Sequence, residues 1–179
     1  MSIRTTASNL EAAAEVVAGK RVAEVENATV SFDGQRVIDN LTTLVSRGDR
    51  IGIVGAGNVG MAAAFSLFVQ KNCSEIVLVD VDEKRTSGEA MDLMHGQAYV
   101  GRIVVQAGNY EDLAGCQIVV VTAGASQKPG ETRLNLLNRN AKIFRSIAAS
   151  LDKYAPDAIV IVASNPVDAL TYIMQKVSN

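Results

Sequence analysis

The feature that most constrains this chain is a glycine loop that directly follows a short apolar strand ending at Val54. Gly55, Gly57 and Gly60 have the spacing Gly-x-Gly-x-x-Gly, and a second apolar strand ends at Asp80, 20 residues after the last glycine. In a strand–loop–helix unit, Gly55 permits a tight turn, Gly57 lets the backbone approach a pyrophosphate, and Gly60 lets the helix pack closely. Asp80 is placed to reach a ribose diol. A glycine triplet alone would be weak evidence for a ligand, but strand, triplet, helix, strand and acid in this order predict a dinucleotide site.

From residue 48 onward, short apolar strands alternate with helices. The strands do not alternate apolar and polar residues, which is typical of a parallel sheet covered on both faces. We expect an α/β fold: a Rossmann-like, doubly wound parallel sheet of five strands in the order 3-2-1-4-5. Besides the strand before the glycine loop, the expected strands are 76–80, 103–106, 118–122 and 158–163, and the expected helices are 58–70, 83–99, 131–154 and one opened by Pro166, with a helical turn at 110–114 and with Met91 and Met94 in the core.

The first 47 residues follow a different pattern. A capping-box pattern at Ser8 predicts a short alanine-rich helix that stops at Gly19, and two apolar stretches, 22–32 and 37–45, flank Asp33-Gly34. Asp-Gly between two such stretches is a strong hairpin signal. We therefore expect an amino-terminal β-hairpin arm over 1–47 and a dinucleotide-binding domain over 48–179.

Composition narrows the class of protein. A formal net charge of −2 gives no reason to expect nucleic acid as a partner. No basic segment precedes an apolar stretch, and no apolar run approaches the roughly 18 residues of a membrane span. Cys73 and Cys116 lie far apart and lack metal-ligand spacing, so we expect buried thiols and no metal. These observations favour a cytoplasmic protein with no membrane partner.

Longer motifs make the chain recognisable. Residues 50–179 resemble the amino-terminal half of the L-lactate and malate dehydrogenase family. The resemblance rests on Gly55-Ala-Gly-Asn-Val-Gly60, Val79-Asp80, Met91-Asp-Leu-Met-His-Gly96, Val121-Thr-Ala-Gly124, Gln127-Lys-Pro-Gly-Glu-Thr-Arg133-Leu-Asn and Ser164-Asn165-Pro166-Val-Asp168. It implies NAD as the cofactor, bound by the three loop glycines and by Asn58, Val59, Asp80, Thr122, Ala123, Gly124 and Asn165.

The same resemblance implies three substrate-side roles. Gln127 stands where the family chooses its substrate, and a neutral amide there suits the methyl group of pyruvate or lactate. Arg133 stands where a mobile-loop arginine polarises the substrate carbonyl and stabilises developing charge. Asn165 stands where an amide contacts both substrate and nicotinamide. A carboxylate at Asp80 disfavours NADP, because it would repel a 2′-phosphate.

The resemblance also implies what lies beyond Asn179: a sixth strand, an aspartate–histidine pair that exchanges the proton, and an arginine that grips the substrate carboxylate. His95 is the only histidine, and it does not match the catalytic one. We therefore expect NAD(H) binding without efficient turnover, with a small 2-hydroxy or 2-oxo acid as partner only if the other half is supplied. The strand 158–163 would form an uncovered sheet edge, which predicts a homo-oligomer.

Residues 21–54 resemble the start of an ATP-binding-cassette ATPase, where a β-hairpin precedes the strand of the phosphate loop. That loop needs Lys and Ser or Thr after its last glycine, but Met61 and Ala62 stand there. The pair of resemblances predicts a chimera joined within residues 50–57. Two alternatives stay open: a fold chimera with no ligand function, and an ATP-binding-cassette-type nucleotide-binding fragment. It also stays open whether Gln127 and Arg133 lie in an unstructured loop, whether the arm packs on the sheet, and whether the chain is designed.

Overall fold

The computed structural model describes residues 21–32 and 35–178. The chain divides into two compact units, Met1–Gly48 and Asp49–Asn179, which we call the ribbon unit and the sheet unit. The glycine loop belongs to the sheet unit.

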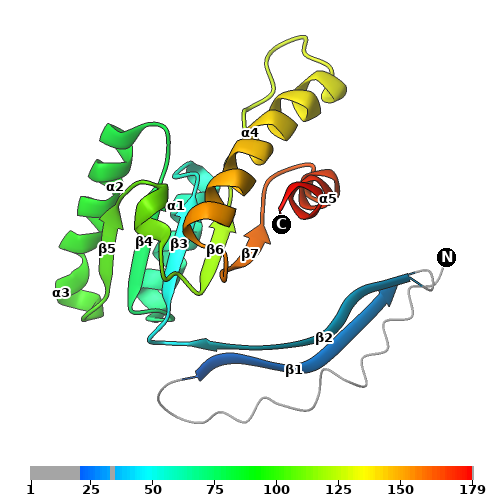
Figure 1. Ribbon diagram of the computed structural model, residues 1–179. Helices are drawn as coiled ribbons and strands as arrows, with labels where there is room; N and C mark the ends of the chain where they lie inside the picture. The colour runs from blue at the N-terminus through cyan, green and yellow to red at the C-terminus, as the bar shows by residue number, and fades with distance from the viewer. Residues whose placement is uncertain (1–20, 33–34, 179) are drawn as a thin grey trace. The chain divides into compact units, whose positions relative to one another are not determined.

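A parallel five-stranded sheet forms the centre of the sheet unit. Its strands are β3 (Arg50–Val54), β4 (Glu75–Val79), β5 (Val104–Ala107), β6 (Ile118–Val121) and β7 (Ile159–Val162), and they lie in the order β5-β4-β3-β6-β7 (Figure 1). Every neighbouring pair is parallel. This order is the predicted 3-2-1-4-5, so the expected Rossmann-like α/β fold is confirmed.

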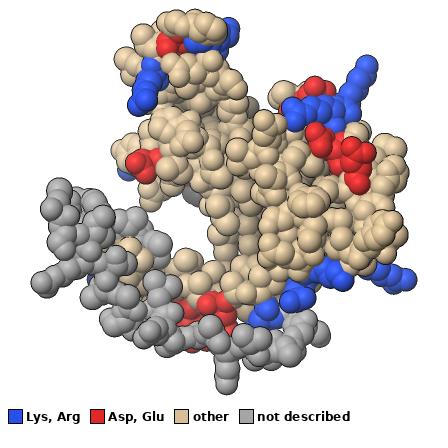
Figure 2. Space-filling view, turned by 180° about the vertical axis from the view of Figure 1, so that it is seen from behind, with Lys and Arg blue, Asp and Glu red and all other residues tan. Residues whose placement is uncertain are grey.

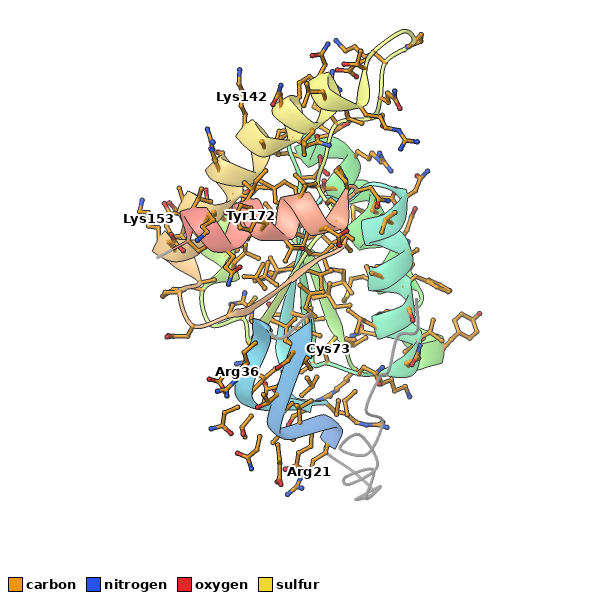
Figure 3. All side chains as sticks on the ribbon, turned by 90° about the vertical axis from the view of Figure 1, so that its right-hand side faces the viewer. Arg21, Arg36, Cys73, Lys142, Lys153 and Tyr172 are labelled. Atoms are coloured by element: carbon orange, nitrogen blue, oxygen red, sulfur yellow. The ribbon has the colours of Figure 1, made fainter. Side chains whose placement is uncertain are left out.

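Helices cover both faces of this sheet. They are α1 (Asn58–Gln70), α2 (Glu83–His95), α3 (Gln97–Val100), the 3-10 turn η2 (Tyr110–Leu113), α4 (Arg133–Tyr154) and α5 (Val167–Val177). In Figures 1 and 3, α1 lies on one face of the sheet while α4 and α5 lie on the other. Among the helices that the structure describes, none is both long enough and apolar enough to cross a membrane.

A hydrophobic core cluster lies on the α4–α5 face. Successive strand residues point to opposite faces, so alternate residues such as Val77 and Val79 face these helices. They pack with Phe144 and Leu151 of α4 and with Leu170 of α5, all of which are buried. The strands thus carry apolar side chains on both faces, which is why they read as continuous apolar runs in the sequence.

Two predicted helix limits were wrong. The helix expected over 83–99 ends at His95, because the Gly96 amide bonds back to Leu93 and a separate short turn, α3, follows. The helix expected from 131 begins at Arg133, because the Thr132 hydroxyl accepts the Asn135 N–H at 3.2 Å as an N-cap.

The core prediction for Met91 was also wrong. Its side chain is 59% exposed, while Ala90 and Leu93 are buried. The apolar stripe of α2 runs through Thr86, Ala90 and Leu93 at helical spacing, and Met91 lies to one side of it.

The ribbon unit contains the predicted antiparallel hairpin. Its strands are β1 (Arg21–Phe32) and β2 (Gln35–Ser46), paired from Arg21–Ser46 to Phe32–Gln35 with several register shifts. The predicted helix over 8–19 and the Asp33-Gly34 turn lie outside the described residues.

Candidate functional site

The glycine loop lies at the carboxyl edge of the sheet, between β3 and α1, and two of its glycines are required by close packing. Gly55 has φ +105°, and a Cβ on it would lie 2.5 Å from the Ala123 backbone nitrogen. A Cβ on Gly60 would overlap the Gly55 carbonyl oxygen and lie 2.7 Å from the Thr122 hydroxyl. Both positions therefore exclude any side chain before a ligand is considered.

Gly57 is different, because nothing in the structure itself requires a glycine there. Its φ of −75° and ψ of −171° are open to any residue, and an added Cβ would meet no atom within 4 Å. The backbone at this point thus faces open space next to the first turn of α1. Such a space fits the pyrophosphate that the sequence predicts there, since helix amino termini favour negative charge.

Two side chains hold the glycine loop from opposite sides. Asp80, directly after β4, accepts the Ala56 N–H on Oδ2 at 2.7 Å and the Asp82 N–H on Oδ1 at 3.1 Å. Thr122, directly after β6, donates its hydroxyl to the Gly55 carbonyl at 2.6 Å. Each carboxylate oxygen of Asp80 keeps acceptor capacity for a ribose hydroxyl. Asp80 can thus hold the glycine loop in place and, at the same time, accept hydrogen bonds from a ribose diol.

A small hollow of about 140 Å³ lies beside Asp80. Residues of α2, the end of β5 and the loop after it line the hollow together with Asp80: Glu83, Thr86, Ser87, Ala107, Gly108 and Asn109. Apart from Asp80, the sequence did not lead us to these residues, although Gly108 and Asn109 follow a parallel strand at the ligand-binding edge and that position is a usable signal. Burial raises the pKa of neighbouring Tyr110, and the negative charge of Asp80 adds to this rise.

The loop after β6 carries the predicted substrate-side residues. Gln127 is exposed in this loop, and Arg133 is exposed as the first residue of α4. Asn165 is exposed after β7, next to Ser164, whose buried hydroxyl donates to the Ala123 carbonyl at 2.6 Å.

The structure therefore brings part of the predicted site together. Hydrogen bonds join the glycine loop to Asp80 and Thr122, and Ser164 joins the β7 end to the β6 loop. Asn58 and Val59 begin α1 and are exposed beside the loop. Within residues 21–32 and 35–178, no hydrogen bond or ion pair links Gln127 or Arg133 to the glycine loop.

The predicted thiols and histidine lie away from this edge. Cys73, in the turn between α1 and β4 (Figure 3), and Cys116 are both free and buried. Burial, with the nearby charge of Asp49, raises the pKa of Cys73 to about 12, so its thiol stays neutral at pH 7. His95 is exposed at the end of α2. Among the described residues, no group of acidic, Cys and His side chains is arranged to hold a metal ion.

Comparisons with known proteins agree with this geometry. Residues 49–179 match the family model described as lactate/malate dehydrogenase, NAD binding domain. An L-lactate dehydrogenase of Salinibacter ruber is 59% identical over 130 residues, which cover 72% of this chain and 41% of that protein. The L-lactate dehydrogenase 1 of Clostridium acetobutylicum is 52% identical over 134 residues, covering 75% and 43%.

Solved structures give the same relationship. A lactate dehydrogenase from a Medee basin deep-sea metagenome library has a TM-score of 0.71 at 42% identity, covering 74% of this chain and 42% of that one. The malate dehydrogenase of Archaeoglobus fulgidus in complex with NADH has a TM-score of 0.69 at 44% identity, covering 72% and 45%. This chain thus spans less than half the length of these relatives. The comparisons give no support to the predicted ATP-binding-cassette segment.

Proposed function

Because this chain belongs to the lactate/malate dehydrogenase family, with NAD as the cofactor of its sheet unit, we propose that it serves lactate-type oxidoreductase chemistry through that domain. The glycine loop, held between Asp80 and Thr122 with Gly57 facing open space, is the observation that carries the proposal. Bound NAD supplies hydride transfer. The residues proposed to hold it are those of the loop, Asp80, Thr122–Gly124 and Asn165.

Cofactor choice is proposed to follow from Asp80. Its carboxylate lies at the loop, with Glu83 lining the hollow beside it, so a 2′-phosphate would meet negative charge. Calorimetric titration with NADH, NADPH and magnesium-ATP tests the proposal, and NADH should bind most tightly. Magnesium-ATP as the preferred ligand would favour the ATPase alternative instead, and no binding at all would favour a chimera without ligand function.

Two replacements of Asp80 separate its hydrogen bond to the Ala56 N–H from its proposed contact with the cofactor ribose. Asp80→Ala should weaken NADH binding by roughly 10- to 100-fold, the cost of losing hydrogen bonds to a charged group, and should narrow the gap between NADH and NADPH. Asp80→Asn retains an acceptor for the Ala56 N–H but removes the charge, so it should narrow the gap while losing less NADH affinity. Titration of both cofactors into both variants measures this. An unchanged preference would mean that Asp80 is not at the ribose.

The substrate class is proposed from Gln127, Arg133 and Asn165. A neutral amide at 127 suits a small 2-oxo or 2-hydroxy acid with an apolar end, such as pyruvate or lactate. An arginine at that position would suit a second carboxylate. We further propose that residues 1–179 alone turn over such an acid inefficiently, since their single histidine, His95, lies on α2 away from the loop edge. The free thiols accord with the cytoplasmic location we propose.

We propose that copies of this chain associate through the face of the sheet unit on which α1 lies, because apolar residues are exposed there. On β7, Ile161 is 46% exposed, and on α1, Phe65 is 58% exposed. Figure 2 shows the face on which α1 lies, and the middle of the sheet unit there carries almost no charged side chains. Within the described residues β7 pairs only with β6, so its other edge presents unpaired backbone groups.

We therefore expect dimers or larger species. Light scattering at several protein concentrations should show a mass that rises with concentration, and Ile161→Lys should lower it, because a charge on an edge strand opposes pairing. Lys176→Ala, a change on the exposed end of α5, is the matched control and should leave the mass unchanged. A strictly monomeric protein at high concentration would contradict this.

A further inference from the structure

The loop after β6 is attached to one turn of α4. The Ala125 N–H donates to Asn140 Oδ1 at 2.8 Å, and the Ser126 carbonyl accepts from Arg139 at 2.8 Å. Arg139 also pairs with Glu131, with Nε and Oε1 3.3 Å apart. Three residues of the loop, Ala125, Ser126 and Glu131, therefore contact two neighbouring residues of α4.

Asn140 is an unusual residue for the place it occupies. It is 2% exposed in the interior of α4, where asparagine has poor helix propensity and an unpaired amide would be costly. Its carbonyl oxygen is instead used to hold a loop 15 residues earlier in the chain. A Cβ on Gly124 would lie 3.7 Å from the Asn140 amide, an ordinary van der Waals distance, so Asn140 lies next to Gly124 as well as bonding to Ala125. Helix propensity does not account for Asn140, but this contact does.

Glu131, at the far end of the loop, contacts both an earlier residue of the loop, Lys128, and Arg139 of α4. Its side chain is 11% exposed, and its second carboxylate oxygen accepts the Lys128 N–H at 2.9 Å. Its backbone carbonyl accepts the Gln127 side-chain N–H at 2.7 Å. The amide proposed to select the substrate is thus fixed by the same segment that Arg139 holds.

We propose that Arg139, Asn140 and Glu131 form a latch that positions the substrate loop, residues 125–131, and the cofactor contact at Gly124. Asn140 fixes the loop where it leaves β6, directly after Thr122 and Ala123, which lie against Gly55 of the glycine loop. Arg139 and Glu131 fix the segment that carries Gln127. They are positioning residues, and the cofactor part of this inference rests on the proposed function.

Amide hydrogen exchange in the full 179-residue chain tests the latch directly. Asn140→Leu removes the acceptor at similar volume, and we expect the Ala125 amide to exchange at least roughly tenfold faster, because its hydrogen bond is lost. NADH affinity should fall by roughly tenfold in the same variant, which corresponds to the loss of about one hydrogen bond's worth of positioning. Asn140→Asp keeps an oxygen acceptor and should restore most of both properties. Lys142→Ala is the control: this exposed residue of the same helix projects into solvent (Figure 3) and should change neither.

Glu131→Gln tests the second half of the latch on a residue whose replacement leaves the core intact. It should speed exchange of the Lys128 amide at least roughly threefold, because a neutral acceptor bonds more weakly, while NADH affinity stays within about twofold. This variant also decides the matter if Asn140→Leu fails to fold. Protection of Ala125 or Lys128 that survives these changes would overturn the latch.

The outcomes separate the latch from the proposed function. If the unmodified chain does not bind NADH, the proposed function fails, and amide exchange still shows whether the latch exists. If Ala125 loses protection in Asn140→Leu while NADH affinity is unchanged, the latch is real but the cofactor part of the inference is wrong.

Discussion

Replacing Gly60 with alanine should destabilise the sheet unit by about 3 kcal/mol, the upper end of what overpacking usually costs. The added Cβ would overlap the Gly55 carbonyl, which is backbone and cannot move without disturbing the turn at φ +105°. The same clash would break the Thr122 hydrogen bond to that carbonyl. Urea unfolding followed by circular dichroism measures the loss, and NADH binding should disappear with it.

Gly57→Ala is the informative partner of that change. An added Cβ there meets no atom of the protein within 4 Å, so the free energy of unfolding should stay within about 0.5 kcal/mol of the original. NADH binding should nevertheless weaken by about 10- to 100-fold, because the methyl group would fill the space proposed for the pyrophosphate. Unchanged NADH affinity in a folded Gly57→Ala variant would place the cofactor elsewhere. An added Cβ on Gly48 would likewise meet no atom within 4 Å, so Gly48→Ala should alter neither property.

The fold was predictable because local signals and global topology agree. Buried parallel strands read as continuous apolar runs, and the glycines at positions 55 and 60 mark a turn whose packing admits no Cβ. The predicted strand order and hairpin arm are confirmed. The sequence could also place Asp80 at the loop, because parallel strands end at one edge of the sheet.

What failed depended on contacts that one sequence cannot reveal. Met91 looks like a core residue by type, but the helix turns Ala90 and Leu93 inward instead. Asn140 looks like a poor helix residue, and its partner Ala125 is 15 positions away, so nothing local indicates the bond. The sequence left open whether the loop that carries Gln127 is ordered for the same reason, since the hydrogen bonds that attach this loop come from α4.

The second large effect concerns turnover. Residues 1–179 should oxidise lactate roughly 10²- to 10⁴-fold more slowly than a full-length relative such as the Salinibacter ruber enzyme, which is the scale that a positioned acid–base group contributes. His95 is the only histidine in the sequence, and it is exposed at the last residue of α2, the end of that helix away from Asp80, so it is not placed to reach a substrate at the loop. Poor substrate orientation should lower the rate further.

Steady-state NADH formation from lactate measures this rate. A matched variant shows whether the activity belongs to this chain or to a contaminating host dehydrogenase. Any residual rate that belongs to the chain should fall in Arg133→Ala, because the exposed guanidinium is proposed to polarise the substrate carbonyl. The rate of NADH formation by a contaminating host dehydrogenase would be the same in both preparations. Adding the part of the Salinibacter ruber enzyme that this chain does not match should raise the rate, since the proposed cofactor half would gain an acid–base partner. A rate near that of the full-length enzyme from residues 1–179 alone, sensitive to Arg133→Ala, would contradict the proposal and require another acid–base group at the loop edge.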